Sequence, residues 1–228
     1  MGSNAPGADR GSRIPRDADA WVRMHRATYE RMAVDYTRRI DDYAAADEAE
    51  RFTRLAAPSP HVGPRILDAG CGPGRDAALL RLAGAEVVGL DLARAMLHQA
   101  RQLDDAAQLC QGDLRRLPVA SNSFDALWCF AALGHLPPAA IPHALTEFHR
   151  VLTNGWLYIV IRQGPGVRTT SWQGSLPRHF TDVTPKTLTA ALHAANFTIH
   201  HQTTRPTPTQ TPWLHTIAKS AQPERPAR

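Results

Sequence analysis

Cysteine is scarce in this chain and is never clustered. The 228 residues include three cysteines, Cys71, Cys110 and Cys129, and contain no CxxC pair or Cys/His group with the spacing of a zinc site. A small, odd number of dispersed cysteines indicates neither a disulfide framework nor a structural metal, so we expect no bound metal. The same scarcity is typical of a protein kept reduced in the cytoplasm.

Long apolar runs are also absent. No stretch approaches the roughly 18 apolar residues with which a helix crosses a bilayer, so we expect no membrane partner. Residues 1–16 are rich in Gly, Ser, Pro and Arg and lack the apolar segment of a signal peptide. We therefore predict disordered tails at residues 1–16 and 221–228.

Lysine is nearly absent, and arginine carries almost all of the positive charge. Lys186 and Lys219 are the only lysines, and the formal net charge is +5. The excess arises in the last third of the chain, where Asp182 and Glu224 are the only acidic residues. No dense basic run occurs, which argues against a nucleic-acid partner but leaves tRNA open as an alternative.

From residue 61 onward, short apolar runs alternate with helical patterns. This alternation predicts an α/β fold with a Rossmann-like, doubly wound sheet of seven strands, mostly parallel, with one antiparallel edge strand. We expect a helical cap at 17–60, the main domain at 61–220, and a loop over Gln163–Pro177. The expected strands are Arg65–Ala69, Glu86–Asp91, Gln108–Gln111, Phe124–Phe130, Trp156–Arg162, Phe197–Thr204 and Trp213–Ala218.

A glycine-rich loop, Asp68–Gly74, follows the first expected strand and opens a helix. Its glycines permit a tight turn and let a ligand approach the backbone where a side chain would clash. Dinucleotide-binding folds use a similar loop, so the glycines alone indicate only a nucleotide-like ligand.

Three aspartates at the ends of three successive strands narrow this prediction. Asp68 can attract a positively charged amino group such as that of a methionine moiety, whereas it would repel a pyrophosphate. Asp91 stands where a carboxylate bonds ribose hydroxyls, and Asp113 can accept from an adenine amino group. By themselves Asp91 and Asp113 could equally cap helices or turns. Together the three acids favour a nucleoside-type cofactor that carries a positive charge.

Several further segments extend the pattern. They are Ile66–Gly74, Val88–Leu97, Gly112–Pro118, Ser123–Trp128, Leu133–Pro137 and Glu147–Leu152. With these segments the sequence resembles the class I S-adenosylmethionine-dependent methyltransferases over roughly residues 29–200. It is most similar to the group that methylates small molecules and resembles ubiquinone-pathway and wobble-uridine enzymes. The turn before the fifth strand reads Asn154-Gly155-Trp156, where the family usually has Pro-Gly-Gly.

The resemblance implies a site for S-adenosylmethionine, with S-adenosylhomocysteine as product. The methionine part would be held by Asp68, Ala69, Gly70 and Gly72, with a backbone contact from Phe130 to its amino group. Asp91 would bind the ribose. Adenine would lie between Leu92 and Met96, and its edge would contact Gly112, Asp113 and the Leu114 amide. Tyr36 would cover the cofactor. Tyr29 matches the same N-terminal signature, although packing of the helix explains it equally well.

The methyl acceptor is less defined than the donor. His135, after the fourth strand, is the candidate general base, because histidine titrates in the useful range. Tyr29, Arg162, Trp172 and His179 are candidate acceptor-binding residues. We expect a small-molecule acceptor methylated on O, N or C by a monomer or homodimer. A tRNA-modifying methyltransferase and a non-catalytic S-adenosylmethionine-binding protein are the alternatives.

Overall fold

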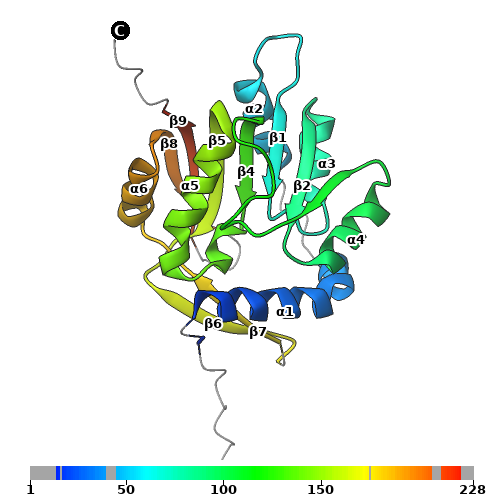
Figure 1. Ribbon diagram of the computed structural model, residues 1–228, viewed down its shortest axis with the longest axis vertical. Coiled ribbons are helices and arrows are strands. Elements are labelled where there is room, and N and C mark those ends of the chain that lie inside the picture. The colour runs from blue at the N-terminus through cyan, green and yellow to red at the C-terminus, as the bar shows by residue number, and fades with distance from the viewer. Residues whose placement is uncertain (1–13, 16, 40–44, 175, 207–211, 222–228) are drawn as a thin grey trace, which may run out of the picture.

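The structure is a computed structural model that describes residues 14–15, 17–39, 45–174, 176–206 and 212–221 (Figure 1). The expected tails at 1–16 and 221–228 lie almost wholly outside these ranges. None of the helices within them is long and apolar enough to cross a membrane.

A seven-stranded sheet forms the centre of the fold, as the sequence predicted. Its order is β3-β2-β1-β4-β5-β9-β8. The strands are β1 (Arg65–Ala69), β2 (Glu86–Asp91), β3 (Gln108–Gln111), β4 (Phe124–Phe130), β5 (Leu152–Arg162), β8 (Phe197–Arg205) and β9 (Trp213–Ser220). The first five strands pair in parallel, whereas β9 runs antiparallel to both β5 and β8, so the final antiparallel pair lies at one edge. The carboxyl ends of β1 to β5 therefore share one edge of the sheet.

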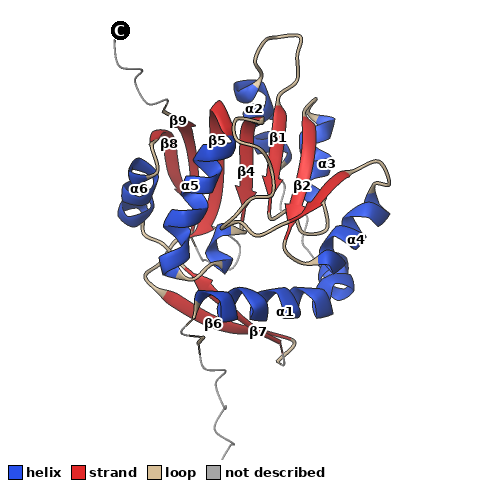
Figure 2. Ribbon diagram, in the orientation of Figure 1, coloured by secondary structure: helices blue, strands red, loops and turns tan. Residues whose placement is uncertain are grey.

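Helices cover both faces of this sheet (Figure 2). The helices α2 (Ala46–Ala56) and α3 (Arg75–Leu82) pack on the face that carries Trp128, while α5 (Ile141–Val151) and α6 (Pro185–Ala194) pack on the other. In α5 the buried residues recur at helical spacing, so one stripe faces the sheet; they are Ile141, Ala144, Leu145, Phe148 and Val151. One buried polar contact ties α3 to the sheet, because Trp128 Nε1 donates to Asp76 Oδ2 at 3.0 Å.

The predicted loop over Gln163–Pro177 is wrong in most of its length. The structure forms a hairpin there, β6 (Val167–Trp172) and β7 (Leu176–Thr181). Gln173 and Gly174 both have positive φ, as a tight hairpin turn requires. The two strands are rich in Arg, Thr and Ser because they do not enter the central sheet, so the apolar pattern of a buried strand is missing.

The long helix α1 (Ala18–Arg39) lies across the carboxyl edge of the sheet and packs against strand β7 of this hairpin (Figure 1). Two long-range contacts hold it there. The Glu30 carboxylate accepts from the backbone N–H groups of Arg94 and Ala95, at 2.8 and 2.9 Å, and so caps α4 (Arg94–Leu103), whose own N-cap residue supplies no side-chain bond. Near the other end, Trp21 Nε1 donates to the carbonyl of His135 at 2.7 Å.

This capping contact predicts the effect of removing Glu30. Glu30→Ala leaves two backbone N–H groups at the start of α4 without their acceptor, which should lower the free energy of unfolding by about 1–2 kcal/mol. Glu50→Ala is the matched control, since Glu50 also pairs with an arginine one turn away but caps no helix. Its effect should stay below about 0.5 kcal/mol. Equal losses for the two variants in urea denaturation would contradict the capping role.

Candidate functional site

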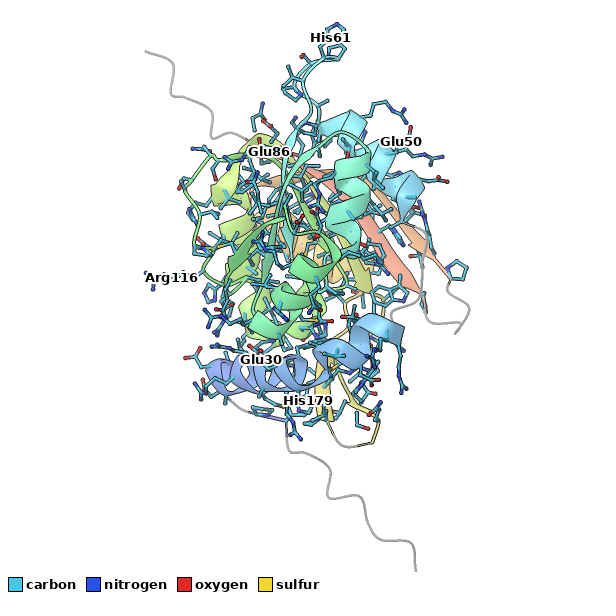
Figure 3. All side chains as sticks on the ribbon, turned by 90° about the vertical axis from the view of Figure 1, so that its right-hand side faces the viewer. Glu30, Glu50, His61, Glu86, Arg116 and His179 are labelled. Atoms are coloured by element: carbon cyan, nitrogen blue, oxygen red, sulfur yellow. The ribbon has the colours of Figure 1, made fainter. Side chains whose placement is uncertain are left out.

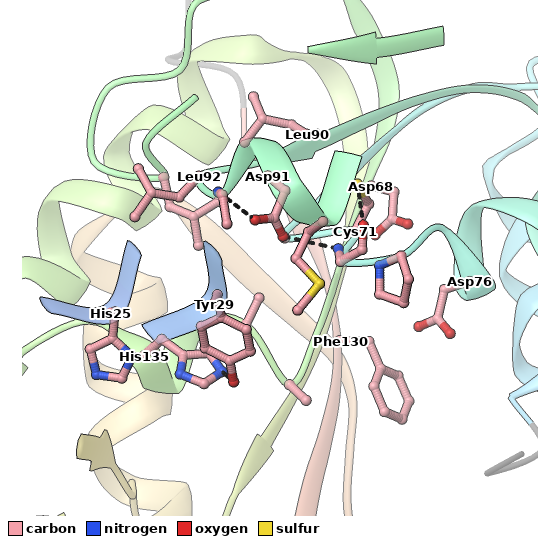
Figure 4. A pocket seen from close by; sticks show the side chains of 18 of the residues that line it. His25, Tyr29, Asp68, Cys71, Asp76, Leu90, Asp91, Leu92, Phe130 and His135 are labelled. Carbon is pink, nitrogen blue, oxygen red and sulfur yellow. Dashed lines mark hydrogen bonds between the residues drawn. The ribbon is translucent and has the colours of Figure 1, made fainter. Parts of the chain in front are cut away.

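A cavity of about 390 Å³ opens at the carboxyl edge of the sheet, under α1. It brings together most of the residues that the sequence singled out: Tyr29, Tyr36, Asp68, Gly70, Gly72, Asp91, Leu92, Met96, Gly112, Asp113, Leu114, Phe130 and His135. In Figure 4, His25, Tyr29 and His135 group at one end and Asp68 and Asp76 at the other, with Asp91 between.

The loop between β1 and α3 is shaped by close approach to a neighbouring loop. Gly70 has a φ of +88°, and a Cβ at this position would lie 2.2 Å from the Cβ of Ala132. Only glycine therefore fits here. At Gly72, also at positive φ, a Cβ would meet no protein atom within 4 Å, so the backbone faces open space where a ligand can approach.

Asp91 links the glycine loop to the end of β2. Its Oδ2 accepts from the backbone N–H of Gly72 at 2.9 Å, and its Oδ1 accepts from that of Ala93 at 2.8 Å. Burial, opposed by these bonds, raises the pKa of Asp91 to about 6. Each oxygen keeps a further lone pair, so the carboxylate fits the two hydroxyls of a ribose.

Asp68 is a buried acid whose second oxygen has no partner. The residue is 2% exposed, and its Oδ2 makes no hydrogen bond within the part of the chain that the structure describes. Burial raises the pKa of Asp68 well above its usual value, and the neighbouring charges of Asp76 and Asp91 raise it further. A buried acid in this state fits a cationic group such as the ammonium of a methionine moiety, which would stabilise the ionised form.

Asp113 lines the cavity but already has a strong partner. The Arg115 guanidinium donates to both of its oxygens, at 2.8–3.1 Å, and also bonds Asp19 on α1. An adenine amino group would share this carboxylate with Arg115. The role of Asp113 in reading adenine therefore stays a prediction.

The opposite end of the cavity is formed by histidine and aromatic side chains. Tyr29 Oη lies 3.2 Å from His135 Nε2, and the ring centroids of His25 and His135 are 5.1 Å apart. Burial lowers the pKa of His135 well below its usual value, with further lowering by His25, Arg178 and Arg168. His135 is therefore neutral at physiological pH.

Four of the predicted site residues do not line the cavity: Ala69, Arg162, Trp172 and His179. Trp172 packs its ring 5.7 Å from that of Tyr36, and Arg162 pairs with Asp182 at 3.2 Å. His179 is fully buried and is not among the residues that line the cavity. The predicted role of Ala69 in cofactor binding, and that of the other three in acceptor binding, stay predictions.

Sequence reasoning missed other lining residues, among them Val22, His25, Arg75, Asp76 and His215. A signal for His25 was present. Trp21, His25 and Tyr29 recur every fourth residue, which places them on one face of a helix. Nothing local marked His215, since its place beside Phe130 arises only when β9 joins the sheet.

The described residues include cysteines and side chains of the kinds that bind metals. In the described ranges, no group of three His, Cys, Asp or Glu side chains could hold a metal ion. Burial raises the pKa of Cys129 to about 12, so this thiol stays protonated.

Comparison with known proteins gives relatives for the sequence and for the fold. A family model described as "Methyltransferase domain" matches residues 66–155. The malonyl-[acyl-carrier protein] O-methyltransferase of Yersinia pestis is 33% identical over 180 residues, which cover 76% of this chain and 66% of that protein. Other relatives of that name are covered over as little as 36% of their length, so the chain spans about a third to two thirds of the curated relatives it matches.

The solved structures that share the fold include an N-methyltransferase and a cyclase. One is the 1,6-didemethyltoxoflavin-N1-methyltransferase of Burkholderia thailandensis, with a TM-score of 0.72 at 22% identity over 96% of this chain and 94% of that one. The other is the [4+2]-cyclase SpnF, with a TM-score of 0.59 at 18% identity over 77% and 80% of the two chains. The family match, the curated relatives and the sheet topology agree. The chain belongs to the class I S-adenosylmethionine-dependent methyltransferases.

Proposed function

We propose that this protein transfers a methyl group from S-adenosylmethionine to an oxygen atom of a small acceptor. One observation carries the proposal: a single cavity joins an end lined by the buried acids Asp68 and Asp91 to an end with His25, Tyr29 and His135. A donor and an acceptor bound there would share one enclosed space.

The donor end suits the cofactor residue by residue. S-Adenosylmethionine supplies a methyl group on a positively charged sulfonium. Asp68 would hold its ammonium, and Asp91 would hold its ribose hydroxyls. Met96 and Leu92 line the cavity and offer apolar contact to the adenine.

Catalysis would rest chiefly on alignment. Holding two reactants close and oriented in a site that excludes water supplies most of what a methyl displacement needs. The lowered pKa of His135 makes it a weak base. An acceptor with a much higher pKa would not readily give up its proton to such a base. The general-base prediction therefore applies to acidic acceptors, and an acceptor that is already ionised needs no base.

Oxygen as the acceptor atom comes from the curated relatives. They are named O-methyltransferases acting on a malonyl group carried by an acyl carrier protein. We extend to this chain the oxygen acceptor and, as a finer proposal, an acyl thioester of this kind. The fold by itself does not decide the reaction, since a cyclase shares it.

The donor site predicts a loss of cofactor affinity in Asp91→Asn. Removing the charge weakens hydrogen bonds worth about 1.5–3 kcal/mol, so S-adenosylhomocysteine should bind roughly 10- to 100-fold more weakly in calorimetry. Protonation has the same effect in the natural protein, whose affinity should therefore fall as the pH drops below about 6. The variant should keep only the pH dependence that Asp68 contributes, so its decline should be smaller. Unchanged affinity at neutral pH would exclude the ribose-binding role, provided that urea denaturation shows intact folding.

Asp68 predicts that binding releases a proton. Its raised pKa favours the protonated form of the free carboxyl group, and pairing with an ammonium would favour the ionised form. The enthalpy of S-adenosylhomocysteine binding at pH 7 should therefore be more exothermic in Tris than in phosphate, because Tris takes up a proton with more heat. In Asp68→Asn this difference should vanish. Equal enthalpies for the natural protein would show that Asp68 is already ionised.

The proposed activity is tested with tritium-labelled S-adenosylmethionine. We expect label to enter a malonyl thioester or a small-metabolite extract as a base-labile methyl ester. Total tRNA should remain unlabelled. Label in tRNA would favour the tRNA-modifying alternative, and cofactor binding without transfer to either fraction would favour a non-catalytic protein.

A further inference from the structure

His25 is a buried imidazole that the proposed chemistry does not yet use. It lies on the face of α1 that also carries Trp21 and Tyr29, with its ring stacked between theirs at centroid distances of 6.0 and 6.5 Å. It is 3% exposed and lines the cavity beside His135. Figure 4 labels both residues at one end of the cavity, and Figure 3 shows the same end of the molecule, where Glu30 and His179 are labelled.

The backbone determines which nitrogen of His25 carries the proton. His25 Nε2 accepts a hydrogen bond from the backbone N–H of His179 at 3.3 Å. Burial lowers the pKa of His25 to about 4, so the ring is neutral at physiological pH. A neutral imidazole has one N–H group, and a backbone N–H can only donate. The proton of His25 must therefore be on Nδ1.

The position of the proton on His135 depends on the neighbouring hydroxyl of Tyr29. The Nε2 atom of His135 faces this hydroxyl at 3.2 Å. The Arg178 guanidinium donates a hydrogen bond to this phenol. That bond lowers the pKa of Tyr29, although burial raises it by more. With Arg178 as its donor, the phenol can give its own hydrogen to Nε2 of His135. In that arrangement, which the proposal below adopts, the neutral ring of His135 carries its proton on Nδ1, as His25 does.

Both of these Nδ1 atoms lack a partner. They are buried, and neither bonds any residue within the described ranges. A buried N–H donor without a hydrogen-bond acceptor destabilises the protein, so two of them in neighbouring rings at one end of a cavity call for a ligand with an acceptor group. The charges of Arg178 and Arg168 reach His135 and make this end favourable for negative charge.

We propose that His25 and His135 bind an anionic oxygen group of the methyl acceptor, such as a carboxylate, through their Nδ1–H donors. His25 is then an acceptor-binding residue, Tyr29 and the His179 amide are positioning groups, and His135 acts as a donor. This proposal rests on the proposed methyl transfer and names the class of its substrate. An acceptor that is anionic in solution needs no general base, which agrees with the weak basicity of both imidazoles.

The test uses the full chain, loaded with S-adenosylhomocysteine and labelled with ¹⁵N in histidine. We expect NMR spectra at pH 7 to show His25 and His135 as neutral Nδ1–H tautomers. Acetate, a small carboxylate probe, should shift both Nδ1 resonances saturably. Acetamide has nearly the same shape without the charge and should bind at least tenfold more weakly.

Two variants of His25 separate donation from packing. In His25→Gln the amide oxygen can replace Nε2 as acceptor for the His179 N–H, while the donor at Nδ1 is lost. In His25→Asn the amide nitrogen can replace the Nδ1 donor, while the acceptor is lost. We expect acetate affinity to fall at least tenfold in His25→Gln and to stay within about threefold in His25→Asn.

Three results would overturn the proposal: an Nε2–H tautomer for His25, resonances that acetate leaves unchanged, or equal affinities for acetate and acetamide. Unfolding midpoints in urea establish that each variant is folded. S-Adenosylhomocysteine calorimetry and tritium transfer measure the proposed function separately. A protein that binds and uses the cofactor but ignores acetate would thus contradict the imidazole pair alone.

Discussion

The site depends on one long-range constraint, the fastening of α1 across the carboxyl edge of the sheet. The Glu30 carboxylate completes the N-terminus of α4, and the Trp21 indole holds the carbonyl of His135. These contacts join residues 64 to 114 positions apart in the chain. Without them, the glycine loop and the strand ends would form an open groove. With them, α1 closes a cavity and brings His25 and Tyr29 to one end of it.

The two ends of this cavity differ in how burial acts on them. At the donor end, burial raises the pKa of Asp68 and Asp91, so these carboxyl groups gain from an arriving cation. At the other end, burial lowers the pKa of His25 and His135, so these rings stay neutral and offer N–H groups. The same desolvation therefore prepares one end for positive charge and the other for negative charge. A sulfonium and an anionic oxygen brought together between them would neutralise each other during transfer.

The predictable part of the structure was the part encoded locally. Apolar runs and their spacing predicted all seven strands of the central sheet, and the antiparallel pair at its edge followed from the missing helix before Trp213. Residues at the ends of parallel strands meet by topology, which is why Asp68, Asp91 and Asp113 could be placed together without a structure. The hairpin β6–β7 was missed because its strands pair only with each other and carry no buried-strand pattern. Asp113 shows a second limit of the sequence analysis. The motif did not indicate that Arg115, two residues away, would bind both oxygens of this carboxylate.

Short local motifs of the sequence predicted the donor side of the proposed site. The glycine loop and the three aspartates Asp68, Asp91 and Asp113 are each recognisable from a short segment of the chain. Because these segments follow successive parallel strands, the sheet brings them to one edge. The acceptor side of the proposed site could be described only from the folded structure. The protonation of His25 depends on an amide of residue 179, and that of His135 depends on a phenol of α1 and a guanidinium of β7. Such hydrogen bonds and burial arise between segments that pack together only after folding, so no local pattern records them.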